Sequence, residues 1–222
     1  MIDTHCHVIK EEMDNYIDII EECSNKDISM IINGYNNDIN KEIISLSNKF
    51  NNVYAACGLN YDEVDKFSDK DLSDLEDIIK NNKICAIGEI GLDYYWTKDN
   101  KDKQIYFFEK QLELAEKYDL PVIVHARESV QDVYDILKKH NVKGTMHCYS
   151  GSLEMAKEFV KIGFYIGIDG PITFKNNNIS MIINAVDVNS SIEVIKISKE
   201  YDNVYAAIGI NYDSIDKASE KI

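Results

Sequence analysis

Met1-Ile-Asp-Thr-His-Cys-His7 opens the chain, and Asp3, His5 and His7 alternate there with Ile, Thr and Cys. Because successive side chains of a β-strand point to opposite faces, a strand here would place these three polar side chains on one face. Two imidazoles on one face, two residues apart, can bind a metal ion, and a chance His-x-His on a solvated strand is the alternative. The rest of the chain decides between them.

Apolar stretches of strand length alternate with amphipathic helical stretches along the chain. Strands are expected at 2–7, 28–32, 53–59, 84–90, 122–126, 145–148 and 164–168. Helices are expected at about 14–24, 39–50, 73–80, 101–118, 130–137 and 153–162. This alternation predicts a parallel sheet, and the number of units favours an α/β fold of the TIM-type (β/α)₈ barrel over an open sheet.

Composition narrows the class of protein. The 222 residues, 45% hydrophobic and 28% charged, fit one globular domain. A formal charge of -15 repels a polyanion at long range, so a nucleic-acid substrate would need local attraction, and a basic DNA-coating protein is excluded. The five cysteines lack C-x-x-C spacing, which argues against a zinc finger or a disulfide framework. Without a leader or membrane span in the sequence, we expect a cytoplasmic protein with no membrane partner and no obligate protein partner.

Four histidines and one glutamate stand where predicted strands end. They are His5, His7, Glu89, His125 and His147. In a parallel barrel the carboxyl ends of the strands share one rim, where active sites form. We therefore expect these five side chains to meet, with His140 excluded as a structural residue near a helix end.

Imidazoles and a carboxylate suit divalent ions such as Zn²⁺ or Mn²⁺, and a carboxylate can bridge two of them. We assign site one to His5, His7 and Glu89, and site two to Glu89, His125 and His147. A paired site lowers the pKa of bound water and neutralises charge on reacting oxygens. Two divalent ions (Zn, Mn or Mg) and hydrolysis, most plausibly of a phosphodiester, are expected.

Four motifs carry a family resemblance: Asp3-Thr-His-Cys-His7, Gly88-Glu-Ile-Gly-Leu-Asp-Tyr-Tyr95, Pro121-Val-Ile-Val-His-Ala-Arg127 and His147-Cys-Tyr-Ser-Gly151. In this order they resemble the TatD family of metal-dependent deoxyribonucleases over roughly residues 1–178. The resemblance implies an amidohydrolase-like TIM barrel and metal-dependent nuclease activity with DNA as substrate, commonly as exonuclease trimming. A different amidohydrolase acting on lactones or amides is an alternative that the ligands alone do not exclude.

Three further rim residues are candidates for substrate binding: Arg127, Tyr149 and Ser150. Arg127 could clamp a phosphate oxygen bidentately, or form an ion pair with Glu128 or Asp132. The backbone N–H groups at Ser150 precede a helix and could bind an anion.

The residues that follow strand four have two possible roles each. Asp93 could orient a ligand from behind, or cap the following loop. Tyr94, Tyr95 and Trp96 could form a platform for stacked bases, or pack inside the barrel.

Residues 179–222 repeat residues 28–71 without a gap, with about half of the positions identical. We therefore divide the chain into a TatD-like hydrolase barrel at 1–178 and a duplicated β-α-β segment at 179–222. This segment stands where the family would have its eighth-strand region, and an incompletely closed barrel is one expected outcome. In a different threading, residues 179–201 form the crossover and 204–210 the eighth strand.

The family's Glu-Thr-Asp-type motif on strand eight is absent, and its aspartate would be implied as a site-one ligand and general base. Asp213 is the candidate replacement, so Glu89 and Asp213 are the candidate catalytic residues, with Asp169 a weaker choice. Asn60-Tyr61 also stands where the family usually has His-Pro. The alternative to an active DNase is a rearranged relative with impaired or no catalysis, because loss of a general base costs about 10² to 10⁴ in rate.

Overall fold

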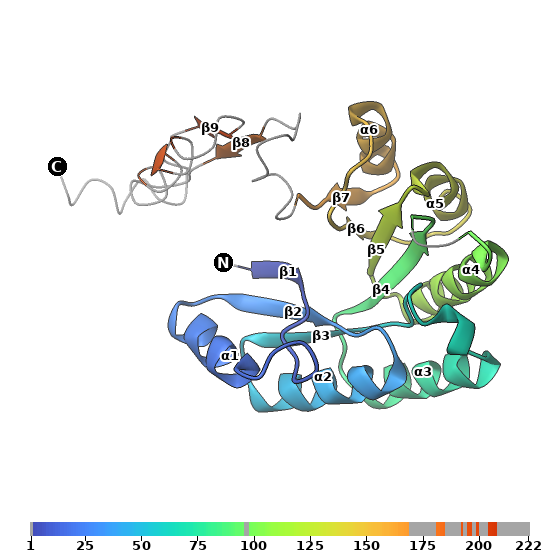
Figure 1. Cartoon of the computed structure of the whole chain (residues 1–222), viewed down its shortest axis with the longest axis horizontal. Coiled ribbons are helices and arrows are strands. Elements are labelled where there is room, and N and C mark those ends of the chain that lie inside the picture. The colour runs from blue at the N-terminus through green and yellow to red at the C-terminus, as the bar shows by residue number, and fades with distance from the viewer. Residues whose placement is uncertain are drawn as a thin grey trace. The chain divides into compact units, whose positions relative to one another are not determined.

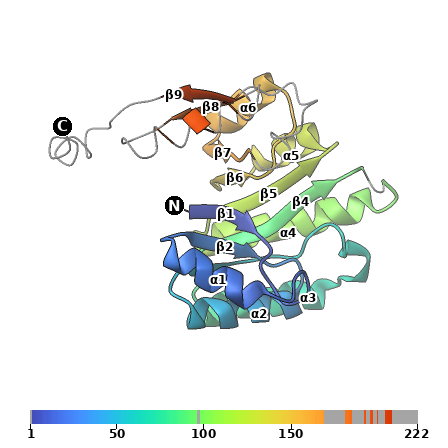
Figure 2. The same ribbon diagram turned by 60° about the vertical axis from the view of Figure 1, so that its left-hand side comes forward.

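Seven parallel strands form one sheet in the order in which they occur along the chain (Figure 1). The strands are β1 (Ile2–Cys6), β2 (Ser29–Asn33), β3 (Val53–Cys57), β4 (Ala86–Asp93), β5 (Val122–Arg127), β6 (Gly144–Met146) and β7 (Phe164–Ile166). Figure 2 shows the sheet from another side, with β1 beside β2 and β6 beside β7. The predicted parallel α/β architecture is confirmed.

Helices connect successive strands and cover one side of the sheet (Figure 1). They are α1 (Tyr16–Asn25), α2 (Asn37–Lys49), α3 (Asp69–Asn81), α4 (Lys101–Tyr118), α5 (Val130–Leu137) and α6 (Leu153–Lys161), with a 3₁₀ turn η1 (Val64–Lys66) before α3. Each strand-helix-strand unit returns the chain to the same end of the sheet, so the carboxyl ends of the strands share one edge.

The structure is a computed structural model, and it describes residues 2–95 and 98–168, the strands at 181–184 and 204–207, and the single positions 192, 195, 196 and 199. The chain divides into two compact units, Met1–Gly167 and Ile168–Ile222, which are described separately. Asp169 and Asp213 lie outside the described residues.

Two apolar clusters hold the first unit together. The larger one contains the fully buried side chains of Ile43, Phe108 and Phe159 from three helices. The smaller one contains Ala56, Ala86 and Ile123, with Ile31 and Cys85 packed against it. Ile123 stands two residues before His125 on β5, so both side chains point to the same face of the sheet.

Among the element boundaries that differ from the sequence expectation, three bear on the packing or on the rim residues. Helix α3 begins at Asp69 rather than near residue 73, because Ser68 and Asp71 form a reciprocal capping box. Strand β4 continues to Asp93, past the expected end at residue 90. Strand β6 ends at Met146, so His147 follows the strand rather than belonging to it.

The second unit contains β8 (Met181–Asn184) and β9 (Val204–Ala207), which pair in parallel. Met181 lies opposite Val204 as Met30 lies opposite Val53, and the following three pairs repeat the β2–β3 register in the same way. In the alternative threading, residues 181–184 belong to the crossover, whereas in the structure they form β8 and keep the strand pairing of their originals. Replacement of the eighth-strand region by the copy stays a prediction.

Two expectations from composition concern the cysteines and membrane-spanning helices. All five cysteines are free thiols, and burial raises the pKa of Cys57 to about 12. Among the described residues, no helix is long and apolar enough to cross a membrane.

Candidate metal centre

Glu89 on β4 is only 3% exposed and lies among four imidazoles. Its Oε1 is 2.9 Å from His147 Nε2 and 3.3 Å from His125 Nδ1. Its Oε2 is 3.4 Å from His7 Nε2 and 3.7 Å from His5 Nε2. The two oxygens of one carboxylate thus face two different pairs of histidines.

The close packing of β4 on β5 sets the position of Glu89 relative to His125. Gly91 lies opposite His125 in the strand register, and its φ of +135° is one that residues with a side chain rarely adopt. A Cβ on Gly91 would lie 2.1 Å from the carbonyl oxygen of His125. Glycine is therefore required for the two strands to approach this closely.

Hydrogen bonds on the far side of two rings determine which nitrogen faces Glu89. The Nδ1 of His7 is 3.0 Å from the carbonyl oxygen of Asn33, so its Nε2 faces Glu89. The Nε2 of His125 is 3.0 Å from Asp93 Oδ2, so its Nδ1 faces Glu89. A carbonyl or carboxylate behind an imidazole fixes its tautomer and ring orientation, as is usual for metal-binding histidines.

Asp93 performs both of the roles that the sequence left open. Its Oδ2 contacts His125, and its Oδ1 accepts a hydrogen bond of 2.8 Å from the backbone N–H of Tyr95. The side chain is 3% exposed. One carboxylate therefore connects the histidine cluster to the loop after β4.

The electrostatics of the cluster favour a charged Glu89. Burial opposes ionisation, but the close imidazoles of His125, His147 and His7 hold the pKa of Glu89 well below its usual range. In the reverse direction, burial lowers the pKa of His7, yet the contact with Glu89 raises it overall. The cluster therefore keeps a buried negative charge surrounded by imidazoles.

The donor set fits a divalent metal ion. Ligand atoms of His5, Glu89 and His147 all lie within 4.8 Å of one another. Among the described residues, these three side chains form the group that could hold a metal ion. Imidazole nitrogens with a carboxylate oxygen suit Zn²⁺ and Mn²⁺. This trio takes one histidine from each of the two pairs around Glu89, so the pairs are close enough to share one centre.

Tyr61 is part of the cluster, although sequence reasoning noted it only as a departure from the family pattern. Its ring stacks on His125 with centroids 4.2 Å apart, and its hydroxyl donates a 3.4 Å hydrogen bond to Glu89 Oε1. Burial, followed by the charge of Glu89, raises the pKa of Tyr61, so the phenol keeps its proton. The signal in the sequence was a large aromatic residue in the loop after a rim strand.

The loop that carries Tyr61 is held by distant residues. Gln111 on α4 binds both the N–H and the carbonyl of Leu59, at 2.7 and 2.8 Å. The side chain of Asn60 accepts the N–H of Asp62 at 3.1 Å. These contacts fix the backbone on both sides of Tyr61.

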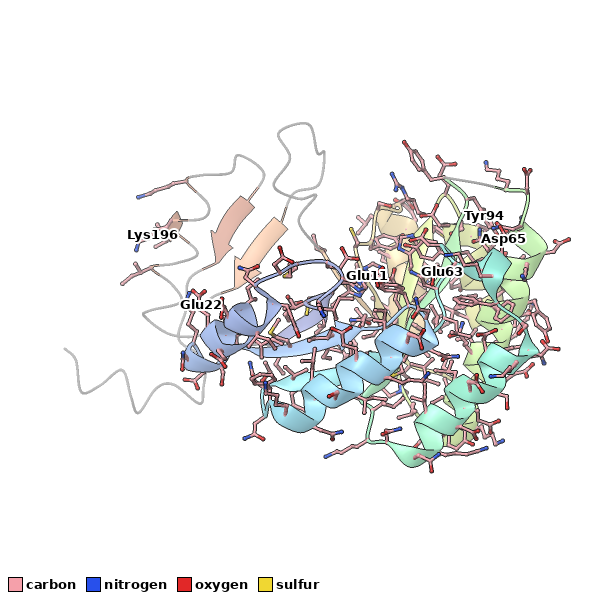
Figure 3. All side chains as sticks on the ribbon, turned by 60° about the horizontal axis from the view of Figure 1, so that its bottom comes forward. Glu11, Glu22, Glu63, Asp65, Tyr94 and Lys196 are labelled. Atoms are coloured by element: carbon pink, nitrogen blue, oxygen red, sulfur yellow. The ribbon has the colours of Figure 1, made fainter. Side chains whose placement is uncertain are left out.

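A cleft of about 330 Å³ opens beside Glu89. It is lined by His7, Glu12, Tyr35, Asn60, Tyr61, Asp62, Glu63 and Glu89 (Glu63 is labelled in Figure 3). Burial and the nearby charges of Glu89 and Asp93 raise the pKa of Asp62. The cleft is therefore acidic, which favours cations over anions at its mouth.

The predicted substrate-binding residues lie in different settings. Arg127 ends β5, with its guanidinium 3.7 Å from the ring centre of Tyr95. The hydroxyl of Tyr149 donates to the carbonyl of Ser152 at 2.8 Å, which ties it to the start of α6. Ser150 is exposed. His140 lies outside the cluster, as expected, with its Nδ1 3.2 Å from Glu116 Oε2.

A parallel α/β sheet with histidines around a buried glutamate where its strands end is the architecture of metal-dependent hydrolases of the barrel type. The sequence model of the family described as TatD related DNase matches residues 2–180. The chain belongs to this family.

Relatives and solved structures agree with this assignment. The metal-dependent hydrolase YabD of Bacillus subtilis is 34% identical over 181 residues, covering 79% of this chain and 71% of that protein. The crystal structure of YjjV, a TatD homologue from Escherichia coli, is similar with a TM-score of 0.72 and 32% identity over 78% of this chain and 70% of that one. A phosphotriesterase homology protein from Escherichia coli shares the fold alone, at a TM-score of 0.58 and 14% identity over 98% of this chain and 85% of that one.

Proposed function

We propose that this TatD-type hydrolase cleaves phosphodiester bonds of DNA, removing nucleotides from a strand end, with two divalent ions as cofactors. Site one would use His5, His7 and Glu89, and site two would use Glu89, His125 and His147. Zn²⁺, Mn²⁺ and Mg²⁺ are the candidate ions. The family membership supports metal-dependent hydrolysis, and DNA as substrate is the finer proposal.

The proposal rests on one observation: each of the two oxygens of Glu89 faces a different pair of the four imidazoles. Oε2 faces His5 and His7, and Oε1 faces His125 and His147. A bridging carboxylate needs this arrangement, because each of its oxygens must reach a different ion. Ions held there would activate water and neutralise charge on the attacking and leaving oxygens of a phosphodiester.

The residues of the chain have defined tasks in this proposal. Glu89 joins the two sites, and Asp93 and the carbonyl of Asn33 hold the rings of His125 and His7 in their binding orientation. Tyr149 and Ser150 belong to the loop before α6 and are proposed to contact the substrate. Asp213 stays the sequence candidate for the missing strand-eight carboxylate.

The first experiment measures metal content by mass spectrometry together with exonuclease activity on DNA. We expect two ions in the protein as purified with metal. We expect Glu89→Ala to lose both ions and all turnover, while His7→Ala and His125→Ala each lose one ion. Glu116→Ala is the matched control, because it removes a carboxylate that contacts another histidine, His140, outside the cluster.

A panel of single-stranded DNA, double-stranded DNA, a small phosphodiester and lactones tests the substrate. Hydrolysis of DNA that Glu89→Ala abolishes and Glu116→Ala preserves supports the proposal. One bound ion with no turnover on any substrate would identify a rearranged relative without catalysis. Faster hydrolysis of a lactone than of any phosphodiester would replace the proposal with a different amidohydrolase activity.

A further inference from the structure

The loop after β3 carries a carboxylate, Asp62, within a run of sequence that the repeat preserves. The run Asn60-Tyr-Asp62 recurs unchanged as Asn211-Tyr-Asp213. Asp213, the sequence candidate for the missing strand-eight carboxylate, is therefore the counterpart of Asp62. Asp62 belongs to the described residues, so its surroundings can be read from the structure.

The backbone on both sides of Asp62 is held in place. The N–H of Asp62 donates to Asn60 Oδ1 at 3.1 Å, and the N–H of Val64 donates to the carbonyl of Tyr61 at 3.3 Å. The ring of Tyr61, the preceding residue, stacks on His125. The loop therefore sets the position of Asp62 relative to the histidine cluster.

Asp62 lines the cleft of about 330 Å³ together with His7 and Glu89. The residue is exposed, so a molecule in the cleft can reach its carboxyl group. Partial burial, followed by the charges of Glu89 and Asp93, raises the pKa of Asp62. The carboxyl group thus lies within electrostatic reach of the cluster.

Two other carboxylates beside the centre already have partners. Asp93 uses one oxygen for an imidazole and the other for a backbone N–H. Glu63, labelled in Figure 3, accepts hydrogen bonds from Lys66 Nζ at 2.6 Å and from Asn36 Nδ2 at 2.7 Å. Within the part of the chain that the structure describes, no hydrogen bond or ion pair engages the carboxyl group of Asp62.

Asp62 is also separate from the group of metal ligands. The ligand atoms within 4.8 Å of one another come from His5, Glu89 and His147, and Asp62 is not in this group. A carboxylate that faces the same cleft without joining the ligands can act on the reacting molecule. Proton transfer by such a side chain contributes about 10² to 10⁴ in rate.

We propose that Asp62 is the carboxylate that transfers the proton during hydrolysis, in place of the family's strand-eight aspartate. The inference rests on the proposed function and adds a catalytic residue to it. As the oxygen of the attacking water bonds to phosphorus, a proton of that water passes to Asp62 and the bond from phosphorus to the leaving oxygen breaks. The proton then passes from Asp62 to the leaving oxygen, so the carboxylate returns to its initial state.

The test compares Asp62→Asn and Asp62→Ala with the unaltered chain in Mn²⁺. The substrates are the 4-nitrophenyl and phenyl esters of thymidine 5′-monophosphate, which differ only in the leaving phenol. The nitrophenolate leaves as a stable anion, whereas a plain phenolate, with a pKa of about 10 like that of tyrosine, needs the proton more. Calorimetric titration with Mn²⁺ measures metal affinity without turnover.

Two further variants separate Asp62 from its surroundings. Glu12→Gln is the matched control, because it removes the same charge from another side chain that lines the cleft. Asp213→Asn removes the counterpart of Asp62 in the repeat. Both should lower kcat at least tenfold less than Asp62→Asn does.

We expect Asp62→Asn to lower kcat for the phenyl ester about 10²-fold or more, and for the nitrophenyl ester at least tenfold less. KM and Mn²⁺ affinity should change less than about threefold, because only a distant charge is lost. Added formate should restore part of kcat in Asp62→Ala, since it supplies the missing carboxylate. A merely structural role of Asp62 would not give this rescue.

A kcat of Asp62→Asn within threefold of the unaltered chain on the phenyl ester overturns the inference. Equal losses on the two esters also overturn it, because the leaving oxygen would then not receive its proton from Asp62. So do a loss of bound Mn²⁺, which would make Asp62 a ligand, and an equal loss of kcat in Glu12→Gln or Asp213→Asn.

The failure of this inference differs from that of the proposed function. An active chain that Glu89→Ala inactivates and Asp62→Asn leaves unchanged contradicts this inference alone. An unaltered chain that hydrolyses neither ester contradicts the proposed function, and this inference with it.

Discussion

Asp93 Oδ2 lies 3.0 Å from His125 Nε2, and through this contact a buried carboxylate fixes the ring that presents Nδ1 to Glu89. Carboxylates in this position raise the basicity of a histidine ligand and hold its orientation. The same carboxylate binds the loop at Tyr95, so its removal should affect the metal centre and the neighbouring surface together.

We expect Asp93→Ala to weaken metal binding at the site of His125 by about 10- to 100-fold, because the ring loses its partner. Asp93→Asn should lose less, since an amide oxygen can still accept the Nε2–H hydrogen bond. Titration calorimetry with Mn²⁺ measures both. Identical isotherms for Asp93→Ala and the unaltered chain would show that the contact has no bearing on metal affinity.

Tyr61 should act through its ring more than through its hydroxyl. The hydroxyl is 3.4 Å from Glu89, near the limit for a hydrogen bond, whereas the ring stacks on His125 at 4.2 Å. Aromatic stacking contributes about 0.5 to 1.5 kcal/mol beyond burial. We expect Tyr61→Leu to weaken metal affinity about 2- to 10-fold and Tyr61→Phe less than twofold.

The control for Tyr61→Phe is Tyr118→Phe, which removes a phenol hydrogen bond to another glutamate, Glu76, outside the cluster. Metal affinity is measured by calorimetry in all three variants. A larger loss in Tyr61→Phe than in Tyr61→Leu would reverse the assignment and make the hydroxyl the important group.

The repeated segment predicts that two residues of the original copy, Gly34 and Asn40, are coupled in their effect on stability. A Cβ on Gly34 would lie 2.0 Å from Asn40 Oδ1, which is itself held by the N–H of Gly58. In residues 179–222 both positions differ together, with Ala185 and Ser191 at the places of Gly34 and Asn40. In the original copy, a serine at position 40 is shorter than asparagine and would leave room for a methyl group at position 34.

We expect Gly34→Ala alone to cost about 1 to 3 kcal/mol of unfolding free energy, because the added carbon overpacks a buried site. Asn40→Ser alone should cost about as much through its lost hydrogen bonds to Gly58. The double variant should be more stable than the sum of the two losses predicts. Chemical denaturation measures the cycle, and simple additivity would mean that the two positions are independent.

Glu76 gives a pH dependence with a definite sign. Hydrogen bonds from Lys117 and Tyr118, each 2.6 Å long, lower the pKa of Glu76 from 4.5 to about 2. The folded state therefore favours the charged form, so the contact stabilises the fold fully above pH 4.5. This stabilisation is lost as the pH falls from 4.5 through about 2.

Glu76→Gln should lower the thermal midpoint by about 1 to 3 °C at pH 7, a size that suits a partly exposed pair in a chain of this length. The difference should shrink steadily in melts taken below pH 4.5. Glu113→Gln, which breaks a pair within α4, is the control and should give a smaller difference at every pH. A difference that stays constant down to pH 3 would place the effect in packing rather than charge.

The resemblance to nucleases could be read from the sequence because few residues carry it. Glu89 and His125 stand near the ends of apolar strand-length stretches, His5 and His7 end an alternating one, and His147 lies in the expected strand at 145–148. In a parallel sheet these ends share one edge, so the position of a residue along its strand predicts its neighbours in space. For the same reason the pairing of β8 with β9 followed from the repeat.

The contacts around these residues could not be predicted in the same way. Tyr61 reaches His125 because Gln111, 52 residues from Leu59 in the sequence, holds the loop. The stacking of Arg127 on Tyr95 depends on the conformation of the loop after β4. Asp93 fixes this loop by accepting the N–H of Tyr95 at its Oδ1. No local pattern encodes such contacts, because they form between residues that only the folded chain brings together.

The sequence by itself determined the parallel α/β class, the five side chains of the cluster and the duplicated strand pair, because strand periodicity and motif order are local properties. The tertiary structure alone decided that Glu89 directs one oxygen to each pair of histidines. It also decided that Asp93 supports His125 and that the single arginine is stacked at the surface. These outcomes depend on distances between different strands and loops, which are set only when the core of the sheet has packed.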